Sequence, residues 1–262
     1  MRELLDLERY PLDRTDSAEL SRLVVQCQHE LADKGMVNLE GFVRPDAIAE
    51  AAAELSQLAA RESYTHQRSH NVYFRDQVEG LAADHPALTR FDTVHHTLCD
   101  DQLGHSVIHR LYEWEPLVGF LSKIMNQPHL SLMADELARV NVMEYRPGEA
   151  LNWHFDRSRY TTTVLIQAAE QGGEFEYCSD LRSEGNPNYE GVGRLLRGDA
   201  ANIQVNTLLP GTLNVFAGKN TLHRVSPVRG NRSRLVAVYS YYDQPGVRFS
   251  DAERQGFYGR TR

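Results

Sequence analysis

The sequence predicts a mainly β protein with additional helices, in which a helical N-terminal region precedes a β-rich core. Before about residue 130, apolar residues recur at helical spacing, whereas after Pro128 short apolar runs alternate with turn-forming pairs such as Pro147-Gly148 and Pro210-Gly211. Short strands separated in this way are typical of a sandwich, a barrel or a jelly roll. We expect strands at residues 137–145, 151–156, 161–167, 173–177, 201–206, 212–216, 222–226 and 234–242.

Length and composition favour one domain. The chain has 262 residues, of which 41% are hydrophobic and 24% charged, as is ordinary for a folded domain. We expect a helical region at 1–130, a β-core at 131–245 and a C-terminal tail at 246–262. The start of the chain is too charged for a signal peptide, and no apolar run reaches the length of a membrane span.

The net charge and the cysteines indicate the compartment and the kinds of partner. A formal net charge of −8 argues against a nucleic-acid-binding surface. The three cysteines, Cys27, Cys99 and Cys178, are widely spaced, which suggests reduced thiols rather than disulfides or a zinc site. We therefore expect a cytoplasmic protein that binds neither nucleic acid nor membranes.

The N-terminal region begins with two helices and a short strand. Residues 16–19 have the form of a capping box, and the apolar spacing after them predicts a helix to about Asp33 that ends before Gly35. Alternation at 36–42 predicts a strand, and Pro45 opens an alanine-rich helix that continues to about Arg61. A further helix is expected from His105 to about residue 125.

Residues 62–103 lack a clear hydrophobic period and contain many polar side chains. We interpret them as long loops with short helices, and a loop region of this length is usually a lid or a functional segment. The tail after Gln244 is polar, and we expect it to lie over the core or to fray.

The candidate site is the sequence Trp153-His154-Phe155-Asp156. Residues i and i+2 of a strand point to the same side, so His154 and Asp156 leave one face together if 151–156 is extended. His223, in a later predicted strand, can supply a second imidazole from across the sheet. Two histidines and one carboxylate that leave three coordination positions open are typical of a non-haem Fe(II) site that activates oxygen.

Two arginines that follow the second histidine are candidates to bind a carboxylate. Arg232 and Arg234 have the same parity in a predicted strand, so either can point inward and offer the fork that pairs with a carboxylate. Arg234 lies 11 positions after His223, and the family resemblance described next, in which this spacing is common, favours Arg234.

With these residues in order, the chain from about 140 to 243 resembles the Fe(II)/2-oxoglutarate-dependent dioxygenase superfamily. The resemblance implies a double-stranded β-helix core, a jelly-roll or cupin-like fold, with the N-terminal helices packed against it. It implies that His154, Asp156 and His223 hold Fe(II), that Arg234 or Arg232 binds the far carboxylate of 2-oxoglutarate, and that O2 is the oxidant. Tyr145 precedes the metal strand and is a candidate hydrogen-bond partner of the co-substrate.

A narrower resemblance rests on the segments His154-Phe155-Asp156-Arg157-Ser158, Gly172-Gly173-Glu174-Phe175 and Leu222-His223-Arg224-Val225. These are similar to the radical halogenases of free amino acids, such as lysine, and their hydroxylase relatives. The halogenases have glycine in place of the metal carboxylate, whereas Asp156 is of the hydroxylase type.

The resemblance therefore implies hydroxylation of an unactivated C–H bond in a small molecule, a free amino acid or a derivative. Arg75, Glu136 and Arg157 are candidate substrate contacts at the mouth of the barrel. Two alternatives remain open: a hydroxylase of a peptide, carrier-bound or secondary-metabolite substrate, and a β-helix protein that binds a ligand without turnover.

Overall fold

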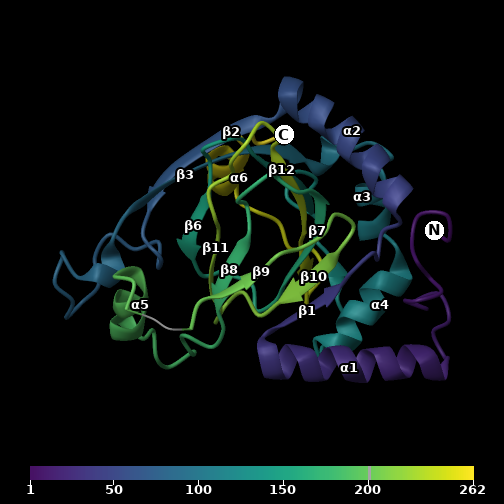
Figure 1. The fold of residues 1–262 in the computed structure, drawn as a ribbon, viewed down its shortest axis with the longest axis horizontal. Coiled ribbons are helices and arrows are strands. Elements are labelled where there is room, and N and C mark those ends of the chain that lie inside the picture. Colours follow the sequence, from purple (N-terminus) through teal and green to yellow (C-terminus); the bar gives the residue numbers. More distant parts are fainter. Residues whose placement is uncertain (200–201) are drawn as a thin grey trace.

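Two antiparallel sheets form the centre of the molecule, in a computed structural model that describes residues 1–199 and 202–262 (Figure 1). The larger sheet has seven strands in the order β1-β10-β7-β12-β5-β3-β2, and the smaller has four in the order β6-β11-β8-β9. The larger sheet consists of β1 (Met36–Leu39), β2 (Tyr64–His70), β3 (Phe91–Cys99), β5 (Val140–Tyr145), β7 (Thr161–Gln167), β10 (Leu213–Phe216) and β12 (Arg234–Tyr239). The smaller sheet consists of β6 (Leu151–His154), β8 (Phe175–Cys178), β9 (Gln204–Asn206) and β11 (Leu222–Val225), and a separate pair joins β4 (Ser131–Leu132) to β13 (Tyr241–Tyr242).

The helices lie mostly outside the larger sheet. They are α1 (Ala18–Lys34), α2 (Pro45–Glu62), α3 (Val107–Tyr112), α4 (Glu115–Ile124), α5 (Tyr189–Leu196) and α6 (Asp251–Tyr258), with short 3₁₀ turns at Pro86–Leu88 and Asp100–Gln102. The first helix begins at Ser17, whose hydroxyl accepts from the Leu20 amide, and ends at Gly35 in the left-handed conformation. This arrangement confirms the predicted mainly β fold with N-terminal helices on a jelly-roll core.

The larger sheet has an apolar face and a cavity face because its strands alternate. Along β12, Leu235, Ala237 and Tyr239 belong to the core that the helices cover, whereas Arg234 and Val236 line an internal cavity. The main core lies between the sheet and helices α1 to α4, so the sheet is a rigid wall whose inner face remains available for a site.

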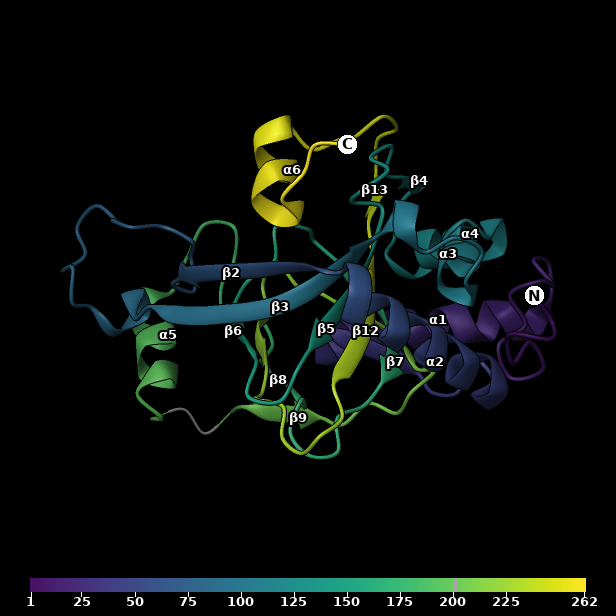
Figure 2. The same ribbon diagram turned by 90° about the horizontal axis from the view of Figure 1, so that it is seen from above.

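Residues 62–103 contain two long strands, so the interpretation of this region as loops with short helices is wrong. β2 and β3 pair in antiparallel register from Tyr64–Thr97 to His70–Phe91 and extend the larger sheet beyond β5. Figure 2 shows the two strands running side by side across the molecule. Their cavity face is polar, which removes the apolar alternation by which a strand is recognised.

Two further expectations need correction, and the tail gains detail. The helix expected at 105–125 is divided into α3 and α4, because Pro116 lies at the start of α4. The tail contains α6, which Ser250 caps with a capping box, and its Phe257 and Tyr258 pack against a buried cluster, in line with the expectation that the tail lies over the core. The predicted strand at 151–156 ends at His154, so Asp156 follows the strand instead of belonging to it. For the strand expected at 201–206, the structure has β9, and Ala201 lies outside the described residues.

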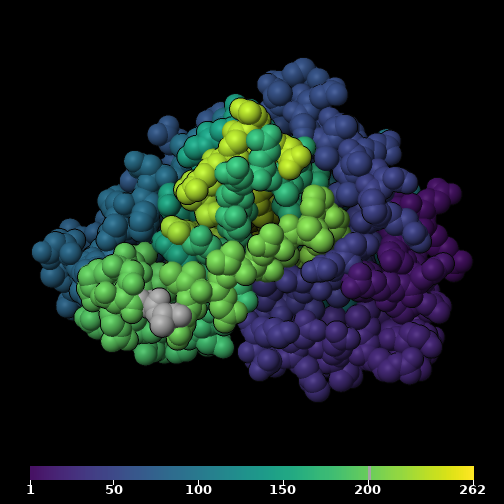
Figure 3. Space-filling model, in the orientation of Figure 1, coloured from purple at the N-terminus to yellow at the C-terminus, as the bar shows by residue number. Residues whose placement is uncertain are grey.

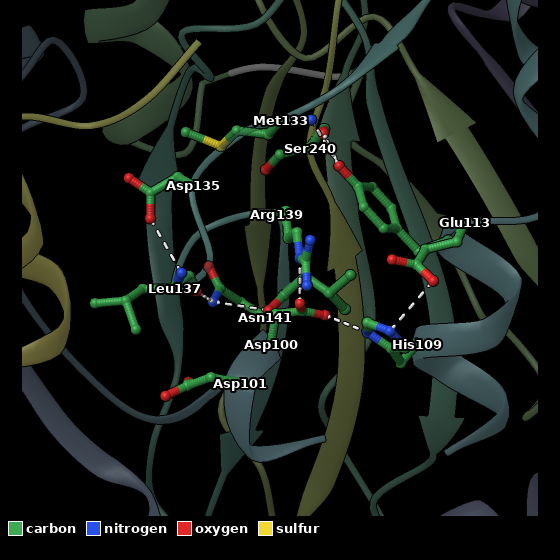
Figure 4. Close-up of polar contacts among 12 residues, drawn as sticks. Asp100, Asp101, His109, Glu113, Met133, Asp135, Leu137, Arg139, Asn141 and Ser240 are labelled. Atoms are coloured by element: carbon green, nitrogen blue, oxygen red, sulfur yellow. Dashed lines mark hydrogen bonds and ion pairs between the residues drawn. The ribbon is translucent and has the colours of Figure 1, made fainter. Parts of the chain in front are cut away.

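Two buried carboxylates join the segments next to β3 and β5 to helix α3 and to the C-terminal segment, and Figure 4 shows part of this cluster. The Asp100 side chain is fully buried; one of its oxygens lies 2.6 Å from Nδ1 of His109, and the other accepts from the Arg139 guanidinium. Asp135 is also fully buried and accepts from the amides of Leu137 and Phe249, and from Arg254. These two carboxylates tie β3, β5 and the C-terminal segment together.

The N-terminal half surrounds the core on several sides in the space-filling view (Figure 3). In the described part of the chain, no helix is both long enough and apolar enough to span a bilayer.

Candidate metal centre

A cavity of about 510 Å³ lies between the two sheets, and residues of both sheets line it. The smaller sheet contributes positions on β6, β8 and β11, and the larger sheet contributes positions on β2, β3, β5, β7, β10 and β12. Cavities of this volume are typical of small-molecule sites.

Three potential metal ligands meet in this cavity. β6 pairs with β11 so that His154 and His223 are opposite each other, and their ring centroids are 4.2 Å apart. Oδ1 of Asp156 lies 3.4 Å from Nε2 of His154 and 3.6 Å from Nε2 of His223. One ligand atom from each side chain lies within 4.8 Å of the others, close enough for all three to bind one ion.

Backbone carbonyls fix which nitrogen of each imidazole faces the cavity. Nδ1 of His154 is 2.8 Å from the Asn152 carbonyl, and Nδ1 of His223 is 2.9 Å from the Thr221 carbonyl. A carbonyl only accepts, so each Nδ1 carries the hydrogen and each Nε2 has a free lone pair. Orientation of metal-binding histidines by such outer contacts is usual.

The space around Asp156 fits a carboxylate closely. Its amide donates to the Gly218 carbonyl, and its Oδ2 accepts from the Thr161 hydroxyl at 2.5 Å. A Cβ atom on Gly218 would lie 2.2 Å from that oxygen, so only glycine leaves room for the carboxylate there.

The charge states of the cluster suit a cation. Burial raises the pKa of Asp156, but the His223 and His154 imidazoles and the Thr161 hydroxyl outweigh burial and hold the pKa well below its usual range. Burial, together with the neighbouring His154, lowers the pKa of His223 to about 4. At neutral pH the cluster therefore offers a carboxylate and a neutral imidazole, the forms in which these groups bind metals.

Arg234 opens β12 and faces the same cavity. Its side chain is buried, and its Nη1 has no hydrogen-bond partner among the described residues. Burial lowers the pKa of Arg234 to about 10, with Tyr145 acting in the opposite direction, so the guanidinium is still charged at neutral pH. A buried charged donor without a partner is costly unless a ligand completes it.

The two candidate arginines, Arg232 and Arg234, lie in different surroundings. Arg232 precedes β12, is exposed, and donates to the Ala168 carbonyl at 2.9 Å. Tyr145 pairs with Arg234 across β5 and β12 and lines the cavity, and its hydroxyl lies 3.8 Å from the Met143 sulfur.

The candidate substrate contacts lie in different places. Arg157 lines the cavity, and it also forms an ion pair with Glu253 at 2.9 Å. Arg75 lines a separate surface pocket next to the main cavity. Glu136 is exposed and is not among the residues that line the cavity. Only Arg157 of these three therefore faces the metal cluster's cavity.

Several cavity residues were not anticipated from the sequence. Thr161 and Gly218 shape the space for Asp156, and their roles depend on contacts between distant strands that no local pattern reveals. His66, Arg68 and His95 line the cavity from the β2–β3 pair. The alternation of His66, Arg68 and His70 is the signal that could have revealed a strand with a polar inner face.

The sequence profile of the Halogenase D family matches residues 20–250, which is most of the chain. This chain belongs to the Halogenase D family. No sequence among curated proteins matches it significantly.

Solved structures similar to this Halogenase D family member show the fold. They include the non-haem alpha-ketoglutarate-dependent carbocyclase SnoK from nogalamycin biosynthesis, with 12% identity over 90% of this chain and 92% of that one and a TM-score of 0.59. HygX from Streptomyces hygroscopicus, solved with nickel, 2-oxoglutarate and hygromycin B, has 14% identity over 82% and 86% and a TM-score of 0.53. A Pseudomonas putida prolyl-4-hydroxylase has 14% identity over 82% and 97% and a TM-score of 0.50.

Proposed function

We propose that this protein is an Fe(II)- and 2-oxoglutarate-dependent dioxygenase that hydroxylates an unactivated C–H bond of a small molecule. One observation supports it most strongly. The convergent ligand atoms of His154, Asp156 and His223 share a cavity with Arg234, a buried charged donor whose Nη1 has no partner in the described part of the chain. A bare metal site would not need that arginine, and a carboxylate-binding site would not need the metal ligands.

The three side chains fit Fe(II). Two imidazole nitrogens and one carboxylate oxygen are the donors of the facial triad, and the hydrogen bonds to the Nδ1 atoms already direct both Nε2 atoms at the shared position. Bound iron supplies the oxygen chemistry, while the protein's side chains orient the reactants and exclude water.

Arg234 is proposed to bind the far carboxylate of 2-oxoglutarate, and Arg232 is not. A guanidinium pairs with a carboxylate through two parallel hydrogen bonds, which would satisfy Nη1. The charges also balance, because Fe(II) and Arg234 together offset Asp156 and the two carboxylates of the co-substrate, so no net charge remains buried. Tyr145, next to Arg234, is proposed to contact the co-substrate.

Hydroxylation rather than halogenation is the proposed outcome. In the halogenases that the sequence resembles, glycine replaces the metal carboxylate, whereas here Asp156 occupies a space shaped by Gly218 and Thr161. The resulting site has no spare position where a chloride would replace the carboxylate.

The proposed substrate is a free amino acid or a derivative, because of the resemblance to amino-acid halogenases and hydroxylases, and O2 is the second co-substrate. The main alternative is a secondary metabolite, since neighbours of the same fold are named for nogalamycin biosynthesis and include an epimerase and a carbocyclase. We propose a cytoplasmic location, since all three cysteines are free and buried.

Succinate formation with Fe(II), 2-oxoglutarate and O2 tests this function against a panel of free amino acids and their derivatives, with and without chloride. Stimulation of succinate release and a product heavier by one oxygen atom are expected. A chlorinated product would contradict the hydroxylase proposal. Iron-loaded protein that forms no succinate under any condition would favour a binding protein without turnover.

A further inference from the structure

The cavity has a second polar wall, beside the metal cluster, formed by one face of the β2–β3 pair; the Thr93 hydroxyl on β3 accepts from the Asn152 amide on β6. His66, Arg68 and His70 alternate along β2, and Thr93 and His95 are their neighbours on β3 in register; all five line the cavity. Figure 2 shows this pair of strands as a continuous ribbon at the edge of the larger sheet. None of these residues belongs to the proposed iron or 2-oxoglutarate sites.

The three histidines of this wall differ in their hydrogen bonds. Both ring nitrogens of His70 have partners, the Asn71 carbonyl at 3.1 Å and the Thr93 hydroxyl at 2.9 Å. By contrast, Nδ1 of His66 and Nδ1 of His95 are buried and have no partner among the described residues, although their rings stack 4.7 Å apart. His70 is thus a structural residue, and the other two retain unused hydrogen-bonding capacity.

Arg68 is the cation of this wall. Its guanidinium lies 4.7 Å from the Phe74 ring centroid, and within the described residues it has no ion pair or hydrogen bond to another side chain. Stacking on a ring uses the face of the guanidinium and leaves its in-plane N–H groups free. Other cations of the cavity are engaged: Arg157 pairs with Glu253, and Arg182 donates to the Lys219 carbonyl.

The charges that line the cavity are unbalanced in favour of cations. Arg68, Arg157, Arg182, Lys219 and Arg234 line it, whereas Asp156 is the single acidic residue among the lining residues of the described chain. Asp156 is already assigned to the metal. A substrate ammonium group would therefore meet several positive charges and no free carboxylate.

We propose that Arg68, with His66 and His95, forms the subsite that binds an anionic group of the substrate, so that the substrate is a carboxylate whose amino group is acylated or absent. This inference rests on the proposed oxygenase function and narrows its substrate class to derivatives rather than free amino acids. A carboxylate would pair with the free edge of the Arg68 guanidinium, and the imidazoles would bind its polar neighbours.

The two imidazoles act as neutral groups. Burial lowers the pKa of His66, and burial together with the other histidines lowers that of His95 to about 3. Each ring therefore offers one donor and one acceptor at neutral pH, which suits an amide or a carboxylate oxygen and adds no further charge. The rings of Phe74 and Phe257, which also line the cavity, provide apolar walls for the rest of the substrate.

Matched pairs of small probes test the subsite. N-acetyl-L-leucine and L-leucinamide have the same side chain but opposite charge, and N-acetyl-L-phenylalanine and L-phenylalaninamide form a second pair. Their binding is measured by calorimetry on the full chain, without metal and again with Fe(II) and 2-oxoglutarate under anaerobic conditions. Arg68→Ala, Arg68→Glu and Arg61→Ala are compared with the parent protein; Arg61 is exposed at the end of α2 and serves as the charge-matched control.

The anionic N-acetyl amino acids are expected to bind more tightly than the cationic leucinamide and phenylalaninamide. Arg68→Ala is expected to weaken binding of the N-acetyl amino acids by roughly tenfold or more, whereas Arg61→Ala should leave it unchanged. Arg68→Glu should reverse the preference between acid and amide. Amides that bind as well as the acids, an Arg68→Ala protein with unchanged affinity, or no binding of either probe would overturn the subsite. Because binding is also measured without iron, a chain that fails to form succinate but still shows the acid preference would refute the oxygenase alone.

Discussion

The molecule has two regions of buried polar groups, one around Asp100 and Asp135 and the other in the cavity, and they differ in how completely those groups are paired. In the first region, Asp100 and Asp135 are fully buried, and both oxygens of each carboxylate have partners. Figure 4 shows the partners of Asp100 and the Leu137 contact of Asp135. In the cavity, Nη1 of Arg234 and Nδ1 of His66 and His95 have no partner within residues 1–199 and 202–262.

This difference separates the groups that stabilise the fold from the groups that we assign to ligands. An unsatisfied buried donor or acceptor costs about 1–3 kcal/mol, so a fold that keeps several in one cavity gives up stability there. The paired cluster should therefore govern unfolding, and the unpaired groups should govern binding. Substitutions in the two regions test this division directly.

The largest effect is expected at the metal ligands. Asp156→Gly removes the carboxylate of the cluster and leaves two imidazoles, so hydroxylation should fall to background and iron affinity should fall, while the fold remains. Metal analysis and succinate formation measure both effects. Asp76→Ala, at an exposed residue paired with Arg90, is the control and should remain active. An Asp156→Gly protein with full hydroxylase activity would show that the ligand assignment is wrong.

Arg234→Met should separate binding from stability. Loss of the charged anchor is expected to raise the Kd for 2-oxoglutarate by about 100-fold, because a buried charge pair is broken. The free energy of unfolding should stay the same or rise by about 1 kcal/mol, because an apolar chain replaces an unpaired buried charge. Calorimetry and chemical denaturation give the two values. If Arg232→Met weakens 2-oxoglutarate binding and Arg234→Met does not, the choice between the arginines is wrong.

Asp135→Asn is expected to show the opposite behaviour. Removing the charge takes from the largely buried Arg254 its close carboxylate partner and leaves only the exposed Asp251, at 3.9 Å, as a counter-charge, so the free energy of unfolding should fall by about 3 kcal/mol. The affinity for 2-oxoglutarate should not change. Loss of co-substrate binding with unchanged stability would show that this cluster contributes to the site.

The same aspartate predicts a pH dependence. Burial raises the pKa of Asp135, but the hydrogen bonds from Arg254 and the Leu137 and Phe249 amides outweigh it and hold the pKa below its ordinary value. Its stabilisation is therefore complete above the unfolded pKa of about 3.9 and is lost as the pH falls through the lower folded value. Denaturation curves between pH 6 and acid should show a steeper loss for the parent protein than for Asp135→Asn, and parallel curves would contradict this.

A smaller effect is expected at Gly218. A methyl group there would overlap Oδ2 of Asp156 and displace the carboxylate, so Gly218→Ala should lower metal affinity or activity by about 10–100-fold, as other changes around metal ligands do. Gly185→Ala is the matched control, because no atom lies within 4 Å of the Cβ that it would gain. Equal activity of the two variants would refute the steric role of Gly218.

The sequence predicted the core better than the N-terminal region. Apolar alternation and turn residues indicated the strands after Pro128, and the confirmed fold class follows from them. β2 and β3 were missed because their inner face carries histidine, arginine and threonine where a core strand carries apolar residues. The polar residues that prevented these strands from being predicted are also the ones that line the cavity.

For the site, sequence patterns predicted only those residues that lie close together in sequence or belong to a recognised motif. His154, Asp156 and His223 were predicted to meet, and the structure brings their ligand atoms within 4.8 Å of one another. The pairing of Asp156 with Gly218 and Thr161 depends on how three chain segments pack, which spacing along the chain does not encode.

Anaerobic titration of Fe(II) and 2-oxoglutarate into the protein tests the central claim most directly, with the visible absorption of the iron–keto acid chelate and calorimetry as readouts. We predict that 2-oxoglutarate binds tightly only after Fe(II), with one equivalent of each, that His223→Ala abolishes both events, and that Arg234→Met weakens only the second. Binding of 2-oxoglutarate that is indifferent to iron, or unchanged in both variants, would contradict the account.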